Sequence, residues 1–126
     1  MHTGGRVMKH HGVFKALADI NRLRIVAVLL QSKGELCICE IMDTLHIAHY
    51  NVSRQVKVLK LAGLVSERRE GRFVFFALKK AGDEFTKNLY KTLMAVDDEI
   101  FSRDQRFLNK RLLLRMNGKC VVGMQK

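Results

Sequence analysis

The feature that most constrains the fold is a change in the spacing of apolar residues at Leu64. Before this point, apolar residues recur at i, i+3, i+4 and i+7 in successive segments, which is the period of amphipathic helices. After it, two stretches rich in β-branched and aromatic residues, 64–68 and 73–78, flank a polar link that contains Gly71. Helical spacing returns after Gly82. The pattern predicts a mainly α fold with a small β-hairpin.

The size and composition of the chain fit one compact domain. The chain has 126 residues, of which 48% are hydrophobic, so it can bury a core and is not expected to be disordered. No apolar run reaches the roughly 18 residues of a transmembrane helix, and the first residues lack the apolar core of a signal peptide. We therefore expect a cytoplasmic protein with no membrane partner.

The charge of the chain predicts a polyanionic partner. The net charge is +11 at pH 7, and the isoelectric point is about 10.0. Between residues 51 and 80 the chain carries eight Lys or Arg and only two Glu, whereas a solubilising surface usually mixes both signs. Nucleic acid is the partner that this imbalance favours. The basic residues of the segment are Arg54, Lys57, Lys60, Arg68, Arg69, Arg72, Lys79 and Lys80.

Two short helices with a tight break at 46–48, followed by a basic hairpin, describe a winged helix-turn-helix. The second helix of this pair is expected to bury Val52, Val56 and Leu59, so its opposite face turns outward. Such a face fits the major groove of duplex DNA, and the hairpin can reach phosphates or the adjacent groove. The residues that we assign to double-stranded DNA are His49, Tyr50, Ser53, Arg54, Gln55, Lys57, Lys60, Arg68, Arg69 and Arg72.

Several segments, taken in order, resemble the ArsR/SmtB family of bacterial and archaeal metal-responsive repressors. Residues 14–19 (FKALAD) and 22–25 (RLRI) resemble its first two helices, and 35–41 (ELCICEI) looks like its arsenic- and cadmium-type box, ELCVCDL. Residues 52–65 are similar to its recognition helix and exit turn, and 68–78 to its wing. The likeness covers about residues 13–96.

The resemblance implies a homodimeric winged-helix repressor, paired through its first and last helices, that releases operator DNA when an inducer binds. The expected organisation is a single DNA-binding domain over 1–126. Its parts are a mobile tail at 1–5, two helices in 6–31, the helix-turn-helix in 35–63, the β-wing in 64–78, one or two dimerisation helices in 82–116, and a tail at 117–126 that carries Cys120.

The chain departs from the family pattern at three positions. The family often has Ser before the recognition helix and again two residues later, where this chain has Ala48 and Tyr50. Loss of a Ser cap costs about 1 kcal/mol of helix stability. The third Cys that some arsenic sensors place three residues after the second is Met42 here. Tyr50 therefore alters the surface that is expected to read the operator.

The cysteines are the candidates for the sensing chemistry. Soft thiolates select soft ions such as As(III), Sb(III), Cd(II) or Pb(II), and As(III) prefers three sulfurs. Cys37 and Cys39 lie in the box, where a helix start with an irregular first turn would let them share an ion, and Cys120 is the candidate third ligand. The inducer is therefore predicted to be As(III) or Sb(III), with Cd(II) or Pb(II) as alternatives, and no cofactor is obligatory.

Two alternatives concern the same cysteines. His2, His10 or His11 could replace Cys120 as a ligand, which would suit Zn or Cd better than As. Cys37 could instead be a small buried hydrophobic residue. No His follows His49, so the family's second site for Zn or Ni on the last helix is absent.

Two alternatives concern the function. Cys37 or Cys39 could form a disulfide or polysulfide with Cys120, which would make the repressor a sensor of redox state or reactive sulfur. The winged helix could also bind protein instead of DNA, although the basic segment argues against this. An enzyme is not expected, because the chain has no Cys-x-x-Cys redox motif, phosphate-binding loop or nucleophile elbow.

Overall fold

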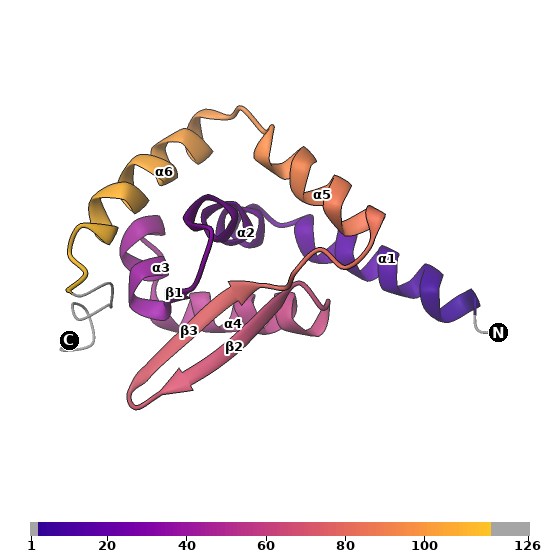
Figure 1. Cartoon of the computed structure of the whole chain (residues 1–126), viewed down its shortest axis with the longest axis horizontal. Coiled ribbons are helices and arrows are strands. Elements are labelled where there is room, and N and C mark those ends of the chain that lie inside the picture. The colour runs from indigo at the N-terminus through magenta and orange to yellow at the C-terminus, as the bar shows by residue number, and fades with distance from the viewer. Residues whose placement is uncertain (1–2, 117–126) are drawn as a thin grey trace.

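The computed structural model describes residues 3–116 and the side chains of residues 10–116. Its elements follow one another in the order α1 (Thr3–Leu17), α2 (Ile20–Ser32), β1 (Leu36–Cys37), α3 (Ile38–Leu45), α4 (His49–Leu61), β2 (Val65–Glu70), β3 (Phe73–Leu78), α5 (Glu84–Met94) and α6 (Glu99–Leu112) (Figure 1). None of these helices is long and apolar enough to cross a membrane.

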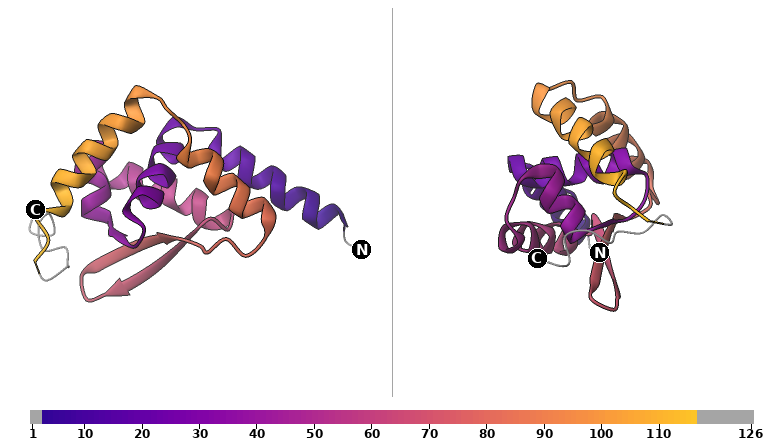
Figure 2. Two further views of the ribbon diagram at one scale, coloured as in Figure 1. Left: turned by 45° about the horizontal axis from the view of Figure 1, so that its top comes forward. Right: turned by 90° about the vertical axis from the view of Figure 1, so that its left-hand side faces the viewer.

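The helices surround α2, and a small sheet projects from one side of them (Figures 1 and 2). The sheet is antiparallel with the strand order β1-β3-β2, and its β2–β3 hairpin extends away from the helices as a wing (residues 65–78). The first turn of α5 contacts α1 through the ring of Phe85, whereas α6 lies at the opposite end of the molecule beside α3 (Figure 1). The predicted mainly α fold with a small β-hairpin is confirmed.

Three details differ from the sequence analysis or complete it. Helix α1 begins at Thr3, so residues 3–5 belong to it and not to a tail, since no proline interrupts the segment. The strand β1 was not expected, because two residues are too few to show an alternating pattern. The segment 82–116, left open between one and two helices, forms two, α5 and α6, with a break at 95–98 between them, and α6 is the single helix within 97–116.

The ends of the elements follow local chemistry. Asp19 caps α2, because its carboxylate accepts hydrogen bonds from the backbone N–H groups of Asn21 (2.9 Å) and Arg22 (3.1 Å). The C-cap residue of α2 is Lys33, which adopts the left-handed conformation with φ of 58°. Gly71 has φ of 61° at the tip of the hairpin, a conformation that glycine adopts without strain.

The core is formed by the inner faces of α2, α3 and α4. Ile25, Ile41 and Leu59 have no exposed side-chain surface, and Val52 and Val56 of α4 are buried with them as the apolar spacing predicts. Burial of each such aliphatic side chain contributes about 1.5–3 kcal/mol. The inner face of α4 is therefore fixed against the body, and its opposite face is left to solvent.

Three arginine–carboxylate pairs bind α6 or the residues just after it to the rest of the domain. Arg24 of α2 forms a buried bidentate pair with Asp104, with N–O distances of 2.8 and 3.0 Å. Arg111 donates to Asp43 of α3 at 2.8 Å. Arg115 donates to both carboxylate oxygens of Glu40, which is fully buried in α3, at 2.6 and 2.8 Å. The last helix is thus attached to the first helix of the helix-turn-helix.

The Asp104→Ala substitution should destabilise the domain by about 3–5 kcal/mol, because it leaves the buried Arg24 guanidinium without its partner. Equilibrium unfolding in urea measures this change. Gln105→Ala is the matched control on the same helix, since Gln105 is exposed and its removal should change stability by less than about 0.5 kcal/mol. Equal stability of the two variants would contradict the role assigned to the buried pair.

Candidate nucleic-acid interface and thiol site

The turn between α3 and α4 sets the position of the outward helix. His46 ends α3 in the left-handed conformation, with φ of 58°, and α4 begins three residues later. Arg24 donates to the carbonyl oxygen of Leu45 at 3.0 Å, and the His46 ring lies edge-on against Phe107 of α6 at 5.0 Å. Both contacts hold the end of α3, so the start of α4 is fixed relative to the core.

The outward face of α4 carries most of the predicted DNA residues. The side chains of His49, Tyr50, Ser53, Arg54, Lys57 and Lys60 are all exposed. Tyr50 is 72% exposed in the first turn. Ala48 is the N-cap residue and supplies no side-chain hydrogen bond, as its identity predicts. The N–H groups of the first turn are thus without a side-chain cap at this end of the helix.

Gln55 differs from the prediction, because its side chain points inward. It is 8% exposed, accepts a hydrogen bond from Arg22 at 2.8 Å and donates one to Asn51 at 3.0 Å. Gln55 follows Val52 by three residues and precedes Leu59 by four, so it shares their helix face. The prediction that Gln55 contacts DNA rested on its polar side chain, whereas its spacing from Val52 and Leu59 places it on the buried face. Gln55 fixes the orientation of α4 and is not part of the outward surface.

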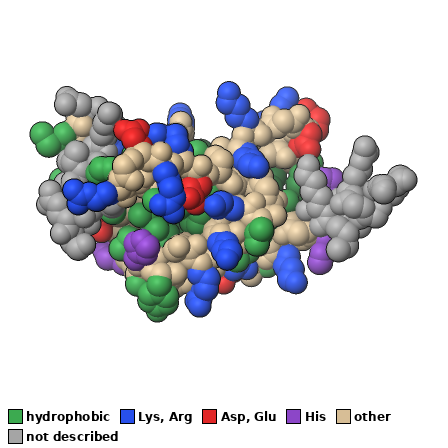
Figure 3. Space-filling view, turned by 90° about the horizontal axis from the view of Figure 1, so that it is seen from below, with side chains coloured by type: hydrophobic (Ala, Val, Ile, Leu, Met, Phe, Trp, Pro, Cys, Tyr) green, Lys and Arg blue, Asp and Glu red, His purple; other side chains and the backbone are tan. Residues whose placement is uncertain are grey.

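Basic side chains gather on the face that carries α4 and the wing (Figure 3). Arg54, Lys57 and Arg72 are exposed, and none of them forms an ion pair within the part of the chain that the structure describes. Lys60 and Arg69 share Glu67, at 2.8 and 3.4 Å, and remain exposed on the same side of the wing. We call this set of exposed cations on α4 and the wing the cationic stripe; a cluster of one sign over a helix and a hairpin is typical of a surface that binds the phosphates of duplex DNA.

Arg68 is also exposed, but its guanidinium is bound within the protein. It forms a bidentate pair with Glu35 at 2.7 and 2.8 Å and a further hydrogen bond with Glu70 at 2.7 Å. It also lies over the ring of Phe75, 4.5 Å from its centroid. These carboxylates raise the pKa of Arg68, and the Arg68 hydrogen bonds lower the pKa of Glu35. Arg68 therefore differs from Lys60 and Arg69, which share one carboxylate of the wing, in binding two carboxylates, one of which lies outside the wing.

The thiol site consists of Cys37 and Cys39 at the start of α3. Cys37 is the N-cap residue of α3, is fully buried and is in the disulfide-bonded state. Cys39 is a free thiol that is 6% exposed. Burial raises the pKa of the Cys39 thiol, and the nearby Asp43 carboxylate adds to the rise, so the thiolate is disfavoured. Cys120, the third predicted ligand, lies outside the described residues.

The backbone around Cys37 is held by charged side chains that sequence reasoning missed. The Cys37 N–H donates to the Glu40 carboxylate at 3.0 Å, and Arg115 donates to the same carboxylate and to the Glu35 carbonyl oxygen. Glu40 and Cys37 are three residues apart, which is the spacing of a capping box and a local signal for this contact. The contact from Arg115 has no local signal, because 75 residues separate it from Glu40.

The alternative histidine ligands do not meet the thiol site within the described residues. His10 stacks on Phe85 of α5, with ring centroids 4.2 Å apart, and α1 lies at the opposite end of the molecule from α3 (Figure 1). His11 is on the same helix, and His2 lies outside the described residues. Among the side chains of residues 10–116, no three His, Cys, Asp or Glu form a group that could hold a metal ion.

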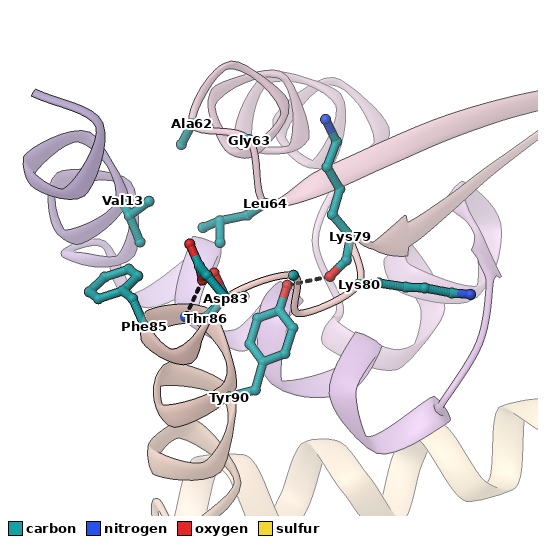
Figure 4. A pocket seen from close by; sticks show the side chains of 11 residues that line it. Val13, Ala62, Gly63, Leu64, Lys79, Lys80, Asp83, Phe85, Thr86 and Tyr90 are labelled. Atoms are coloured by element: carbon teal, nitrogen blue, oxygen red, sulfur yellow. Dashed lines mark hydrogen bonds between the residues drawn. The ribbon is translucent and has the colours of Figure 1, made fainter. Parts of the chain in front are cut away.

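A pocket of about 380 Å³ lies between α1, the end of α4 and the start of α5 (Figure 4). Val13, Leu64 and Phe85 line it, and the Tyr90 hydroxyl donates to the Lys79 carbonyl oxygen at 2.7 Å beside it. The Lys79 and Lys80 side chains point away from the pocket (Figure 4). Asp83 also lines the pocket, and its carboxylate accepts a hydrogen bond from the Thr86 N–H at 2.9 Å as the N-cap of α5 (Figure 4). The pocket charges thus have a structural explanation, and the cationic stripe remains the candidate site.

The fold and this surface define a winged helix-turn-helix DNA-binding protein. Residues 19–67 match the arsR family of bacterial regulatory proteins. The chain is 33% identical over 92 residues to the arsenic resistance transcriptional regulator ArsR1 of Pseudomonas putida, and the match covers 73% of this chain and 71% of that protein. It is 33% identical over 90 residues to a homologue of the cadmium resistance regulatory protein CadC of Staphylococcus aureus, covering 71% of each.

A solved structure agrees with these matches. The homodimeric winged helix-turn-helix DNA-binding domain of Mb0332 from Mycobacterium bovis has a TM-score of 0.61 and 28% identity, and the match covers 71% of this chain and 79% of that one. The chain therefore belongs to the arsR family of bacterial transcriptional regulators.

The burial of Cys39 predicts slow alkylation. In the Cys37→Ser, Cys120→Ser double variant, Cys39 is the single thiol, and iodoacetamide should modify it at least about tenfold more slowly in the native protein than in urea, because only the exposed thiolate reacts. The raised pKa means that this difference is largest near neutral pH and narrows above the ordinary thiol pKa of about 8.5. Mass spectrometry of timed samples measures both rates, and equal rates would contradict the assigned burial.

Proposed function

We propose that this chain is a homodimeric, cytoplasmic transcriptional repressor that leaves its operator when As(III) or Sb(III) binds its cysteine thiolates. The observation that carries the proposal is the position of Cys37, the N-cap residue of the first helix of the helix-turn-helix. A ligand on this sulfur acts directly on the helix against which α4 packs. The family and the names of its relatives are compatible with this function, since they include regulators of arsenic and cadmium resistance.

DNA binding follows from the outward face of α4 and the tip of the wing. Arg54 and Lys57 are free of acidic partners among the described residues, so they are available to guanine edges or phosphates in the major groove. Arg72 stands beside Gly71 at the tip of the hairpin, from which it can reach the neighbouring backbone or minor groove. Tyr50, with its exposed ring in the first turn of α4, is placed to contact bases or phosphates.

A homodimer presents two such surfaces to two half-sites. Phe14 of α1 is 57% exposed and Met94 of α5 is 54% exposed, although both are large and apolar. The first turn of α5 meets α1, where Phe14 is in edge contact with Phe85 (Figure 1). We assign the contact between subunits to this α1–α5 surface. Helix α6, which was expected to contribute as a last helix, has its apolar face buried within the same subunit, at Phe101 and Leu108.

The inducer acts through the geometry of α3. Half-sites of a dimeric helix-turn-helix protein lie about 34 Å apart, so a small rotation of α4 misaligns both subunits on the duplex. Bringing the sulfurs of Cys37 and Cys39 toward one ion distorts the first turn of α3, since residues two apart point about 200° apart on a regular helix. A coupling free energy of about 1–3 kcal/mol is typical of such linkage.

The chemistry of the thiols favours a soft ion. Three sulfurs suit As(III) and Sb(III), while Cd(II) and Pb(II) are the nearest alternatives. After a thiol reductant supplies the two electrons that reduce the disulfide of Cys37, Cys37 and Cys39 supply two sulfurs, and the proposal assigns the third to Cys120. Because the described residues bury Cys39 and disfavour its thiolate, binding must open the first turn of α3. The inducer then binds only when the first turn of α3 is distorted.

A second candidate function is a sensor of redox state or reactive sulfur, and the disulfide-bonded state of Cys37 favours it. In that reaction two thiols lose two protons and two electrons to an oxidant such as hydrogen peroxide, which becomes water. The DNA-binding surface and the route from Cys37 to α4 stay the same. The two candidates differ in the signal alone.

Titration of the protein on its own upstream DNA tests the inducer. With fluorescence anisotropy at fixed salt, As(III) or Sb(III) should weaken binding by about 5- to 150-fold, the usual range of such couplings, while Zn(II) should have little effect. Hydrogen peroxide or polysulfide, added in place of the ion, identifies the second candidate. Cys37→Ser should bind DNA in the absence of inducer and lose the response to either signal.

The outcomes of this titration separate the two parts of the proposal. Equal affinity with and without each ion and oxidant would remove the sensing role of the thiols. Equal affinity for the upstream fragment and for random duplex would remove the operator-binding role, whatever the thiols bind.

Salt dependence tests the DNA surface. Lys57→Ala should weaken binding and reduce the slope of log affinity against log salt concentration by about 1 for each phosphate that the variant no longer neutralises. Lys110→Ala is the matched control, because Lys110 is exposed on α6, away from the cationic stripe. Both slopes come from anisotropy titrations over a fourfold salt range. A reduced slope in the Lys110 variant alone would place the DNA on a different face.

A further inference from the structure

Arg68 is the point at which the wing meets the thiol site. The other cations of the stripe pair with acids of the wing itself or with no acid in the described part of the chain, whereas Arg68 reaches Glu35, 33 residues earlier. Glu35 lies two residues before Cys37. Both oxygens of the Glu35 carboxylate are used, in the bidentate geometry that gives an arginine pair its directional specificity.

The register of the sheet explains this contact. Cys37 of β1 pairs with Phe75 of β3, and Phe75 pairs on its other side with Arg68 of β2. Directly paired residues of an antiparallel sheet share a face, so Cys37, Phe75 and Arg68 form one row across three strands. The Arg68 guanidinium crosses the Phe75 ring to reach Glu35, which lies on the same side as Cys37 because two residues separate them.

The segment 35–37 is held at three points. Arg68 binds the Glu35 carboxylate, Arg115 binds the Glu35 carbonyl oxygen at 2.8 Å, and Glu40 binds the Cys37 N–H at 3.0 Å. A change at the Cys37 sulfur that alters the start of α3 therefore moves the segment that holds Arg68. Since Arg68 and Glu35 are about half and a third exposed, DNA phosphate can reach the guanidinium once Glu35 releases it.

We propose that Glu35 is a positioning residue that competes with DNA phosphate for Arg68, and that the state of Cys37 decides which of them Arg68 binds. In the present structure Cys37 is disulfide-bonded and Arg68 is bound to Glu35. This is the arrangement of the DNA-releasing form. In the DNA-bound form Glu35 withdraws, and Arg68 adds a phosphate contact to the stripe. The inference rests on the proposed thiol sensing for the part played by Cys37.

Glu35→Gln removes the competing charge and tests the proposal by salt dependence. We call the protein thiol-engaged when Cys37 is in a disulfide or bound to an inducer. In this state, the variant should steepen the slope of log affinity against log salt by about 0.9 per protomer, the value for one additional phosphate contact. Its advantage over the wild type then grows about threefold per protomer when salt falls fourfold. The ratio of the DNA affinity with reduced Cys37 to the affinity of the thiol-engaged protein should be smaller in the variant than in the wild type, by the factor by which the variant tightens binding in the thiol-engaged state.

Glu67→Gln is the matched control. The substitution removes one carboxylate from β2, the strand that carries Arg68, and releases Lys60 and Arg69. The ion pairs of Glu67 do not involve the segment 35–37. It should tighten binding equally in both thiol states and leave their ratio at the wild-type value. The double variant Glu35→Gln, Arg68→Ala should lose the added slope. Thermal unfolding of each variant separates these effects from a change in stability.

Each result decides one part of the proposal. An unchanged slope in Glu35→Gln, or the same slope when Arg68 is absent, overturns the competition for Arg68. A ratio that falls equally in the Glu67 control overturns the special role of Glu35. If the wild-type protein binds DNA equally in both thiol states, the proposed sensing function and the control by Cys37 fail. The slopes of Glu35→Gln and its double variant, measured in the thiol-engaged protein, still decide the competition for Arg68.

Discussion

The geometry of the helix-turn-helix, formed by α3 and α4, depends on Arg24. Its buried guanidinium joins α2 to the last carbonyl of α3 and to Asp104 of α6. Removing this charge from water is costly, and only a complete set of acceptors offsets that cost, so the three elements have one favourable arrangement. The turn at His46 and the start of α4 follow from that arrangement.

The arginines of this chain divide between two tasks. Arg24, Arg111 and Arg115 neutralise buried or half-buried carboxylates and hold α6 on the helix-turn-helix. Arg54 and Arg72 face solvent with no such partner in the described residues. The net charge of +11 therefore overstates the charge available to DNA, because part of it is used in these internal pairs.

Sequence patterns predicted what local spacing determines. Apolar residues at helical spacing gave the inner face of α4, and the polar link with Gly71 gave the hairpin, because both signals extend over a few neighbouring residues. The same spacing, applied to every residue, would have placed Gln55 inside. Contacts between distant residues had no such signal: Arg68 with Glu35 and Arg115 with Glu40 became visible only when the sheet register and the path of α6 were known.

Because α6 is attached to the helix-turn-helix, the segment that carries the helix-turn-helix and the wing cannot be transferred to another protein as an independent module. A chimaera that transplanted residues 35–78 alone would carry Glu40, fully buried in α3, without the arginine that neutralises it, and would leave Arg24 behind on α2. The specificity of such a regulator would therefore be re-engineered more safely by exchanging single outward residues of α4 than by grafting the whole segment onto another scaffold.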